Sequence, residues 1–119
     1  MSYNRQTILS CEENHSIDCR LQAALAIVGG KWKLKIFQCL KNGLPLRFTA
    51  LFKNLAGISE KTLTAQLREM EEDGILSRSV YAEIPPRVEY QLTILGEALA
   101  PVCQALENWA EIYLTSRKD

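Results

Sequence analysis

The stretch GISEKTLTAQLREMEEDGIL, residues 57–76, decides the fold. Its apolar side chains recur at helical spacing and predict one buried stripe, made of Leu63, Leu67 and Met70. Ser59 is placed to cap the start of this helix, and Gly74 is placed to end it. The stripe is narrow for a helix of this length, so most of the helix surface is predicted to remain outside the core.

The exposed side of this helix is sorted by charge along its axis. Basic and small residues stand near its start: Lys61, Thr62, Thr64, Ala65 and Arg68. An acidic run, Glu69 with residues 71–73, follows them. Charge pairs four residues apart do not explain this sorting, because Lys61 has Ala65 at that spacing. The pattern is expected of a helix whose first half enters the major groove of DNA, where Arg, Lys and Thr reach base edges or phosphates.

The segments before this helix are also predicted to be helical. Apolar periodicity predicts a helix that begins near residue 17 and is ended by a glycine pair. A second helix is predicted over residues 31–41, with its lysines facing outward. Thr49 is placed to cap a short third helix, which would pair with the quoted helix across Gly57.

After the quoted helix the period changes to two, which predicts two strands. The loop between them carries two prolines and is predicted to be stiff, with Arg87 at its tip. There Arg87 can enter a minor groove or bridge phosphates, or it is simply a lone surface arginine. A last helix is predicted from residue 93 to about residue 114, bent but not ended by Pro101. This order predicts an α+β, mainly helical, winged helix-turn-helix domain with a two-stranded wing and an extra helix at each end.

The composition is that of one compact globular domain. The chain has 119 residues, of which 47% are hydrophobic and 24% are charged. Residues 1–15 show no usable period and are predicted to form a flexible arm, whereas residues 16–119 form the domain. The net charge is zero, but residues 31–61 hold seven basic residues and one acidic residue. This block is either a positive face for a nucleic acid or a solvated lysine surface.

The sequence gives no sign of membrane insertion or secretion. The longest apolar run, AALAIV at 23–28, is far shorter than the roughly 20 residues of a membrane span. The stretch MSYNRQTILSCEENHS lacks the basic-then-apolar order of a secretory signal. A cytoplasmic location is therefore expected.

The four cysteines, Cys11, Cys19, Cys39 and Cys103, follow no metal-binding spacing. His15 alone cannot complete a Cys/His zinc site, so neither a metal nor a cofactor is expected. A thiol enzyme with Cys19 as nucleophile would lack a positioned base, so no enzymatic activity is predicted. Cys39 and Cys103 stand beside apolar stripes and are predicted to be packing residues.

Three stretches are informative together: CRLQAALAIVGGKW (19–32), LRFTALFKNLAGISEKTLTAQLREMEEDGILSR (46–78) and PPRVEYQLTILGEAL (85–99). In combination they resemble the HxlR family of bacterial winged-helix transcription regulators, relatives of the MarR-like group. The resemblance runs from Cys19 to about Tyr113 and implies a homodimer that binds an inverted-repeat operator in double-stranded DNA. The matching recognition-helix positions are Ser59, Lys61, Thr62, Thr64 and Arg68, and the matching wing position is Arg87. The alternative is a winged-helix module that binds proteins and not DNA. The basic residues Lys61 and Arg68 argue against it.

The last predicted helix carries an apolar seam with residues spaced four and three apart: Leu95, Leu99, Val102, Leu106, Trp109 and Tyr113. A domain of this size has too little core to cover so long a stripe, which favours a two-fold partner. The alternative is that this helix folds back on its own chain.

Cys19 is predicted to lie in the first turn of the first helix, where the helix dipole favours a thiolate. Several HxlR-type regulators use a cysteine at the matching position to sense oxidants or electrophiles. The resemblance therefore makes Cys19 a candidate sensor, with Cys11 as a candidate resolving thiol. The alternative is a partly buried, inert cysteine. The sequence does not identify a small-molecule inducer.

Overall fold

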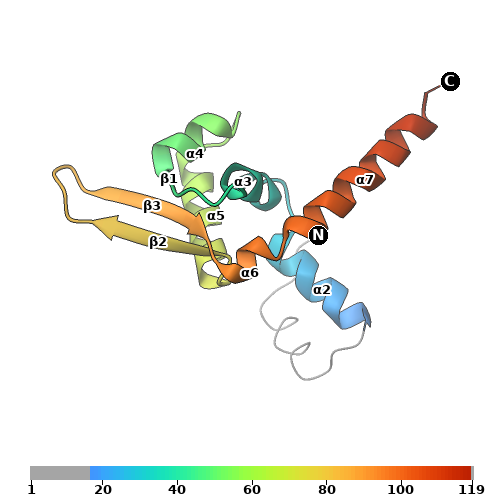
Figure 1. Cartoon of the computed structure of the whole chain (residues 1–119), viewed down its shortest axis with the longest axis horizontal. Coiled ribbons are helices and arrows are strands. Elements are labelled where there is room, and N and C mark those ends of the chain that lie inside the picture. The colour runs from blue at the N-terminus through green and yellow to red at the C-terminus, as the bar shows by residue number, and fades with distance from the viewer. Residues whose placement is uncertain (1–16, 119) are drawn as a thin grey trace.

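The computed structural model describes residues 17–118, so the predicted arm lies outside the described residues. Helices pack beside the base of a small antiparallel sheet, from which a two-stranded ribbon projects (Figure 1). In chain order the elements are α2 (Ile17–Val28), α3 (Lys33–Leu40), β1 (Leu46–Arg47), α4 (Phe48–Asn54), α5 (Glu60–Glu72), β2 (Leu76–Tyr81), β3 (Arg87–Leu92), α6 (Ile94–Glu97) and α7 (Ala100–Ser116). This order confirms the predicted winged helix-turn-helix fold.

The core lies where α3, α4 and α5 meet the base of the sheet. The side chains of Ile36, Leu40, Leu51 and Leu63 are fully buried there. The stripe predicted on the quoted helix is confirmed, because Leu63, Leu67 and Met70 are all buried. Burial of this stripe fixes which side of α5 faces outward.

The sheet has three strands in the order β1-β3-β2, all antiparallel. The two predicted strands are β2 and β3, whose register runs from Leu76 opposite Leu92 to Tyr81 opposite Arg87. Sequence periodicity did not reveal β1, since two residues are too few to show alternation. Strand β1 pairs with Glu89 and Tyr90 in the middle of β3 and leaves the outer part of the ribbon as a two-stranded wing.

Two predicted helix starts are wrong. Thr49 does not cap α4, which begins at Phe48 with Arg47 at the N-cap position and no side-chain cap. Arg47 is held extended by its pairing in β1, so the chain enters the helix directly from the sheet. Helix α3 begins at Lys33 and not at residue 31, and Lys33 is buried instead of facing outward.

The single helix predicted from residue 93 to about 114 is two helices, α6 and α7. Thr93 caps α6, because its Oγ1 accepts a hydrogen bond from the Gly96 N–H at 3.0 Å. Pro101 lies in the first turn of α7, where a missing N–H costs no intrahelical bond. The prediction that Pro101 bends a continuous helix is therefore wrong; it marks the start of α7.

Helix α6 is joined tightly to the base of the wing. The Thr93 hydroxyl lies 2.5 Å from the Gly74 carbonyl oxygen and 3.2 Å from that of Ile75. Gly96 is buried, and a Cβ atom at this position would collide with the Ile75 carbonyl. These contacts join the start of α6, the helix that precedes α7, to the turn that follows α5.

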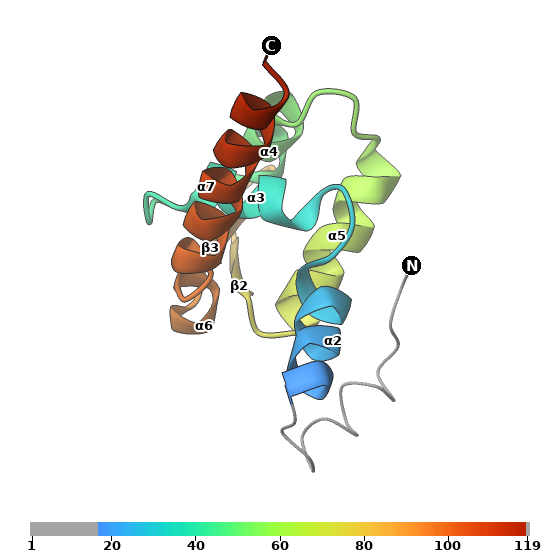
Figure 2. The same cartoon turned by 90° about the vertical axis from the view of Figure 1, so that its right-hand side faces the viewer.

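Helices α2 and α7 lie at one end of the molecule, and the tip of the wing lies at the other (Figure 1). Figure 2 views the first end, where α2 and α7 are nearest to the reader and α3 crosses between them. The helix-turn-helix pair, α4 and α5, occupies the region between the two ends.

Candidate nucleic-acid interface

The start of α5 is fixed by a local hydrogen-bonded cap. Gly57 adopts a left-handed conformation with φ of 87°, which turns the chain before the helix. The Ser59 Oγ accepts a hydrogen bond from the Thr62 N–H at 3.1 Å, and its hydroxyl donates to Thr62 Oγ1 at 2.9 Å. The predicted cap is confirmed, and Thr62, which is half-buried, takes part in it.

Replacing Ser59 by Ala is expected to lower the free energy of unfolding by about 0.5–2 kcal/mol, because the cap bond is lost. Urea unfolding followed by circular dichroism measures the change. Ser79→Ala, at an exposed serine of β2, is the matched control and should leave stability within about 0.5 kcal/mol. Equal stability of both variants would show that the cap contributes nothing.

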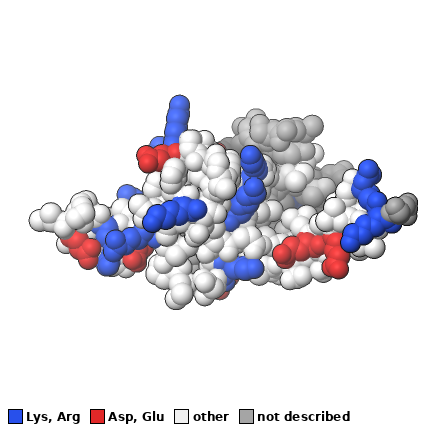
Figure 3. Space-filling model, turned by 90° about the horizontal axis from the view of Figure 1, so that it is seen from above, with Lys and Arg blue, Asp and Glu red and all other residues white. Residues whose placement is uncertain are grey.

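The outward side of α5 presents two cations that no ion pair between described residues engages. Lys61, Thr64, Ala65 and Arg68 are all exposed. Among residues 17–118, the ion pairs include neither Lys61 nor Arg68. In Figure 3 the basic side chains lie at several separate places, from the wing to the opposite end of the molecule. Both cations of α5 are thus available to an anionic partner.

The acidic end of α5 is tied to the scaffold. Glu69 Oε2 lies 3.5 Å from Lys33 Nζ, and the Lys33 side chain is only 9% exposed. Enclosure of an ammonium is costly unless a carboxylate accompanies it, so this pair links α3 to α5. Sequence reasoning missed it, although Lys33 stands three, four and seven residues before Ile36, Phe37 and Leu40 of the buried stripe.

Arg87 does not lie at the tip of the wing, as the sequence suggested, but opens β3 directly opposite Tyr81. Its guanidinium carbon is 4.1 Å from the centroid of the Tyr81 ring. Its Nη2 is 3.6 Å from Glu83 Oε1 and its Nε is 3.6 Å from Glu89 Oε2, with 27% of the side chain exposed. These contacts balance its charge and clamp the two strands together where the loop begins.

Arg78 is a wing cation that the sequence analysis did not single out. It is exposed on β2, opposite Tyr90, and takes no part in the ion pairs of the described chain. The sequence could have indicated this wing cation, because Arg78 stands on a predicted strand directly after the recognition helix.

The apolar seam predicted on the last helix remains largely uncovered. Leu95, Val102, Leu106, Trp109 and Tyr113 are each 43–62% exposed, whereas Leu99 packs against the core. The rings of Trp109 and Tyr113 stack with centroids 5.5 Å apart. On α2, Leu21 and Leu25 are also exposed. One end of the molecule therefore carries two apolar helix faces.

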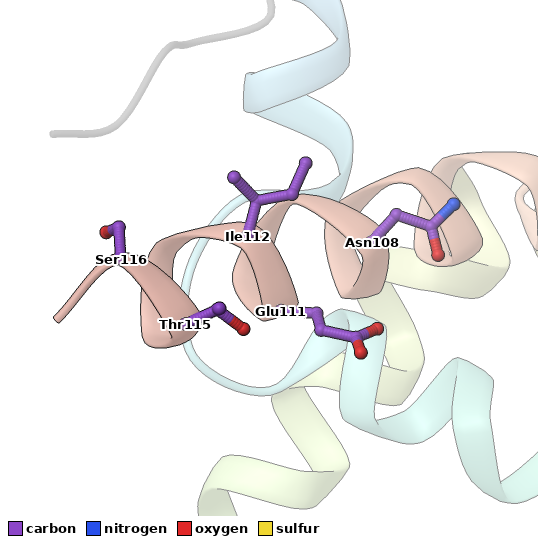
Figure 4. Close-up of a pocket in the computed structure, with 5 residues that line it drawn as sticks. All are labelled: Asn108, Glu111, Ile112, Thr115 and Ser116. Carbon is purple, nitrogen blue, oxygen red and sulfur yellow. The ribbon is translucent and has the colours of Figure 1, made fainter. Parts of the chain in front are cut away.

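The outer part of α7 borders an open hollow of about 590 Å³, and among residues 17–118 this helix alone lines it. Figure 4 shows that all five lining side chains come from α7: Asn108, Glu111, Ile112, Thr115 and Ser116. The described part of the chain supplies no facing element here.

The cysteines fall into two groups. Cys19 is half-buried in the first turn of α2, as predicted, while Cys11 lies outside the described residues. Cys103 is buried and Cys39 packs against the core, which confirms that both are packing residues. Burial raises the pKa of the Cys39 thiol and is the main cause of a raised pKa at Cys103, where Glu107 adds to it. Both thiols are therefore less ionised at neutral pH than an exposed thiol.

Between residues 17 and 118, no three His, Cys, Asp or Glu side chains gather as metal ligands. No helix in that range is long and apolar enough to span a membrane.

Comparison with known proteins places this arrangement among transcription regulators. The family model described as HxlR-like helix-turn-helix matches residues 27–118. An uncharacterized HTH-type transcriptional regulator of Methanothermobacter thermautotrophicus is 41% identical over 95 residues, which cover 80% of this chain and 72% of that protein.

Solved structures of transcription regulators are also similar to this chain. A MarR-family transcriptional regulator from Enterococcus faecalis V583 superposes with a TM-score of 0.76 at 38% identity, covering 86% of this chain and 92% of that one. The redox regulator HypR in its oxidized form gives a TM-score of 0.72 at 39% identity, covering 85% and 99% of the two chains. The chain belongs to the HxlR-like helix-turn-helix family and is a transcriptional regulator of the HxlR and MarR type.

Proposed function

We propose that this regulator binds double-stranded DNA as a homodimer, with one α5 helix in the major groove of each half of an inverted-repeat operator. The observation that carries the proposal is the surface of α5. Lys61 and Arg68 are exposed and unengaged among the described residues, while the nearby Glu69 is held by Lys33. Lys61 and Arg68 are thus open to an anionic partner such as DNA, and the negative charge of Glu69 is partly neutralised by Lys33.

The proposed contacts follow from this geometry. Lys61, Thr64 and Arg68 would meet base edges or phosphates, and Ala65 lets the helix backbone approach closely. Ser59 and Thr62 would shape the start of the helix through their mutual hydrogen bonds, and their hydroxyls border the groove. In the wing, we assign Arg87 the task of holding the loop in place, next to the DNA.

The dimer is proposed from the uncovered helices. A second copy that packs its α7 seam and α2 face against those of the first would bury the exposed leucines and the Trp109–Tyr113 stack. Two-fold packing of one patch on itself is the commonest form of oligomer. It would place two α5 helices about one helical turn of DNA apart.

A response to oxidants through Cys19 is a second, separable part of the proposal. Cys19 lies in the first turn of α2, where the positive end of the helix dipole favours a thiolate. The similar protein HypR is described as a redox regulator and has been solved in oxidized and reduced forms. Because α2 lies at the proposed dimer end, oxidation of Cys19, with Cys11 as candidate partner, would alter how two copies pack.

Selection of bound sequences from a random DNA pool tests the proposal, with the purified protein in the presence and absence of diamide. We expect an enriched inverted repeat in reducing buffer, and loss of binding after oxidation in the unchanged protein but not in Cys19→Ser. An inverted repeat that is indifferent to diamide would remove only the thiol response. No enrichment even at low salt would overturn DNA binding and favour a protein-interaction module.

Replacing Arg68 by Ala is expected to weaken binding to the selected operator by about 1–3 kcal/mol, the cost of losing one base-edge contact. Fluorescence anisotropy with operator and with scrambled DNA measures the change and its sequence dependence. Lys118→Ala, which removes one exposed cation after the end of α7, is the control and should bind normally. Identical losses in both variants would indicate a general charge effect in place of base reading.

A further inference from the structure

The tip of the wing is apolar and exposed. Ile84 is fully exposed, and Pro85 and Pro86 beside it are exposed as well. In Figure 3 the wing lies at the left end of the molecule, and its outermost atoms belong to uncharged residues. The end of the projecting ribbon therefore presents aliphatic side chains to the solvent, where they are free to contact a partner.

The residues behind the tip hold it outward. Arg87 contacts Tyr81 across the strand pair and approaches Glu83 in the loop, so the base of the loop is clamped from both sides. The same contacts hold the Arg87 guanidinium at the base of the loop and balance the charge of Glu83. What the wing presents at its end is therefore aliphatic surface and not a guanidinium.

The length of the wing matches the spacing of DNA grooves. Strands β2 and β3 have six residues each, and at about 3.3 Å per residue they span roughly 20 Å. The distance along B-DNA from a major groove to the next minor groove is half a turn, about 17 Å. Strand β2 follows α5 after a single turn, so the ribbon starts at the helix proposed to occupy the major groove. Arg78, exposed on β2, then faces the phosphates between the two grooves.

The opposite end of the molecule does not compete for this surface. The exposed helix faces of α2 and α7, which we assign to a second copy, lie far from the wing tip (Figure 1). Dimerisation through those helices would leave Ile84 uncovered. We therefore infer that the wing tip contacts the DNA beyond the half-site.

We propose that Ile84, supported by Pro85, packs into the minor groove beside each half-site as an apolar wedge. The inference rests on the proposed DNA binding and adds a specificity-determining residue to it. Aliphatic side chains and proline enter the minor groove in this way and partly unstack one base step. Unstacking is easiest at flexible pyrimidine–purine steps, so the wedge would favour TA or CA at the flanking position, which no hydrogen bond reads.

The test compares Ile84→Ser and Ile84→Leu with the unchanged full-length protein on the selected operator. We expect Ile84→Ser to weaken binding roughly tenfold, as for loss of one buried aliphatic group, and Ile84→Leu to retain affinity. The slope of log affinity against log salt should not change, because no phosphate contact is lost. Ile94→Ser changes an isoleucine that is 88% exposed at the start of α6, away from the wing tip; it is the matched control and should bind normally.

A second readout reports on the base step itself. With 2-aminopurine at the flanking step, fluorescence should rise on binding of the unchanged protein and much less with Ile84→Ser. Replacing the flexible step by AA should remove the difference between the two proteins. Circular dichroism and dimer mass, equal in all variants, keep a folding defect from imitating the effect.

The outcomes separate the two proposals. If the unchanged protein binds its operator but Ile84→Ser binds equally well, the wedge is wrong and DNA binding stands. A loss accompanied by a flatter salt dependence would also overturn the wedge, because it would indicate an electrostatic role. If the unchanged protein selects no DNA, the proposed function fails and the wedge fails with it, leaving the tip to a protein partner.

Discussion

A Leu106→Glu variant is expected to be monomeric at concentrations where the unchanged protein is a dimer. Leu106 lies in the middle of the α7 seam and is half exposed in the single chain. In the proposed dimer each copy would bring a carboxylate into an apolar contact, which costs several kcal/mol unless the charge is paired. The dimer dissociation constant should therefore rise by roughly 100-fold or more. Sedimentation equilibrium measures this directly.

Loss of the dimer should also remove most of the operator affinity. Two linked α5 helices gain an effective concentration that raises affinity by about 10²–10⁴ over a single one. Gln104→Glu adds the same charge to α7 on the side opposite the seam and is the control. If Leu106→Glu remains dimeric with normal operator binding, α7 is not the interface. Unchanged helical content by circular dichroism shows that the monomer is folded.

Gly96→Ala is expected to destabilise the protein by about 1–3 kcal/mol, although alanine is the better helix former. In an open helix this change would stabilise by up to about 1 kcal/mol. Here the new Cβ would meet the Ile75 carbonyl oxygen, a backbone atom that cannot rotate away, and would crowd Leu92. Either α6 or the base of β2 must shift. Thermal unfolding should show a clearly lower Tm.

Glu97→Ala is the control for this prediction, because it places the same residue at the next, exposed position of α6. It should change stability by less than about 0.5 kcal/mol. A more stable Gly96→Ala protein would contradict the close approach of α6 to the wing base. Reduced operator affinity in the folded fraction would indicate that this joint also sets the position of α7.

Local patterns in the sequence predicted the fold where short-range chemistry decides it. Periodicity located the buried stripe of α5, and residue type located its Ser59 cap. The same reasoning was wrong at Thr49 and Pro101. The pairing of Arg47 with Glu89 decides where α4 begins. Helix α6, joined to Gly74 through Thr93, ends before Pro101, which lies in the first turn of the next helix. Both causes involve residues far apart in the chain.

The candidate site was predictable in its exposed part only. Lys61, Thr64 and Arg68 face outward as expected, and their contacts with DNA stay predictions. The positions of Lys33 and Arg87 depend on partners supplied by another element, a carboxylate on α5 in one case and a ring on β2 in the other. Such cross-element pairing leaves no period in the sequence, so a buried lysine and a clamped arginine resemble surface cations.

The Lys33–Glu69 pair divides α5 into positions that evolution can vary freely and a position that it cannot. Exchange at Lys61, Thr64 or Arg68 would disturb no ion pair among the described residues, so a duplicated copy could drift toward a new operator without refolding. Loss of Glu69 alone would leave the buried Lys33 ammonium without this carboxylate. Positions 33 and 69 should therefore covary among relatives. Helix α5 can therefore change the DNA sequence that it recognises while its packing against α3 is conserved.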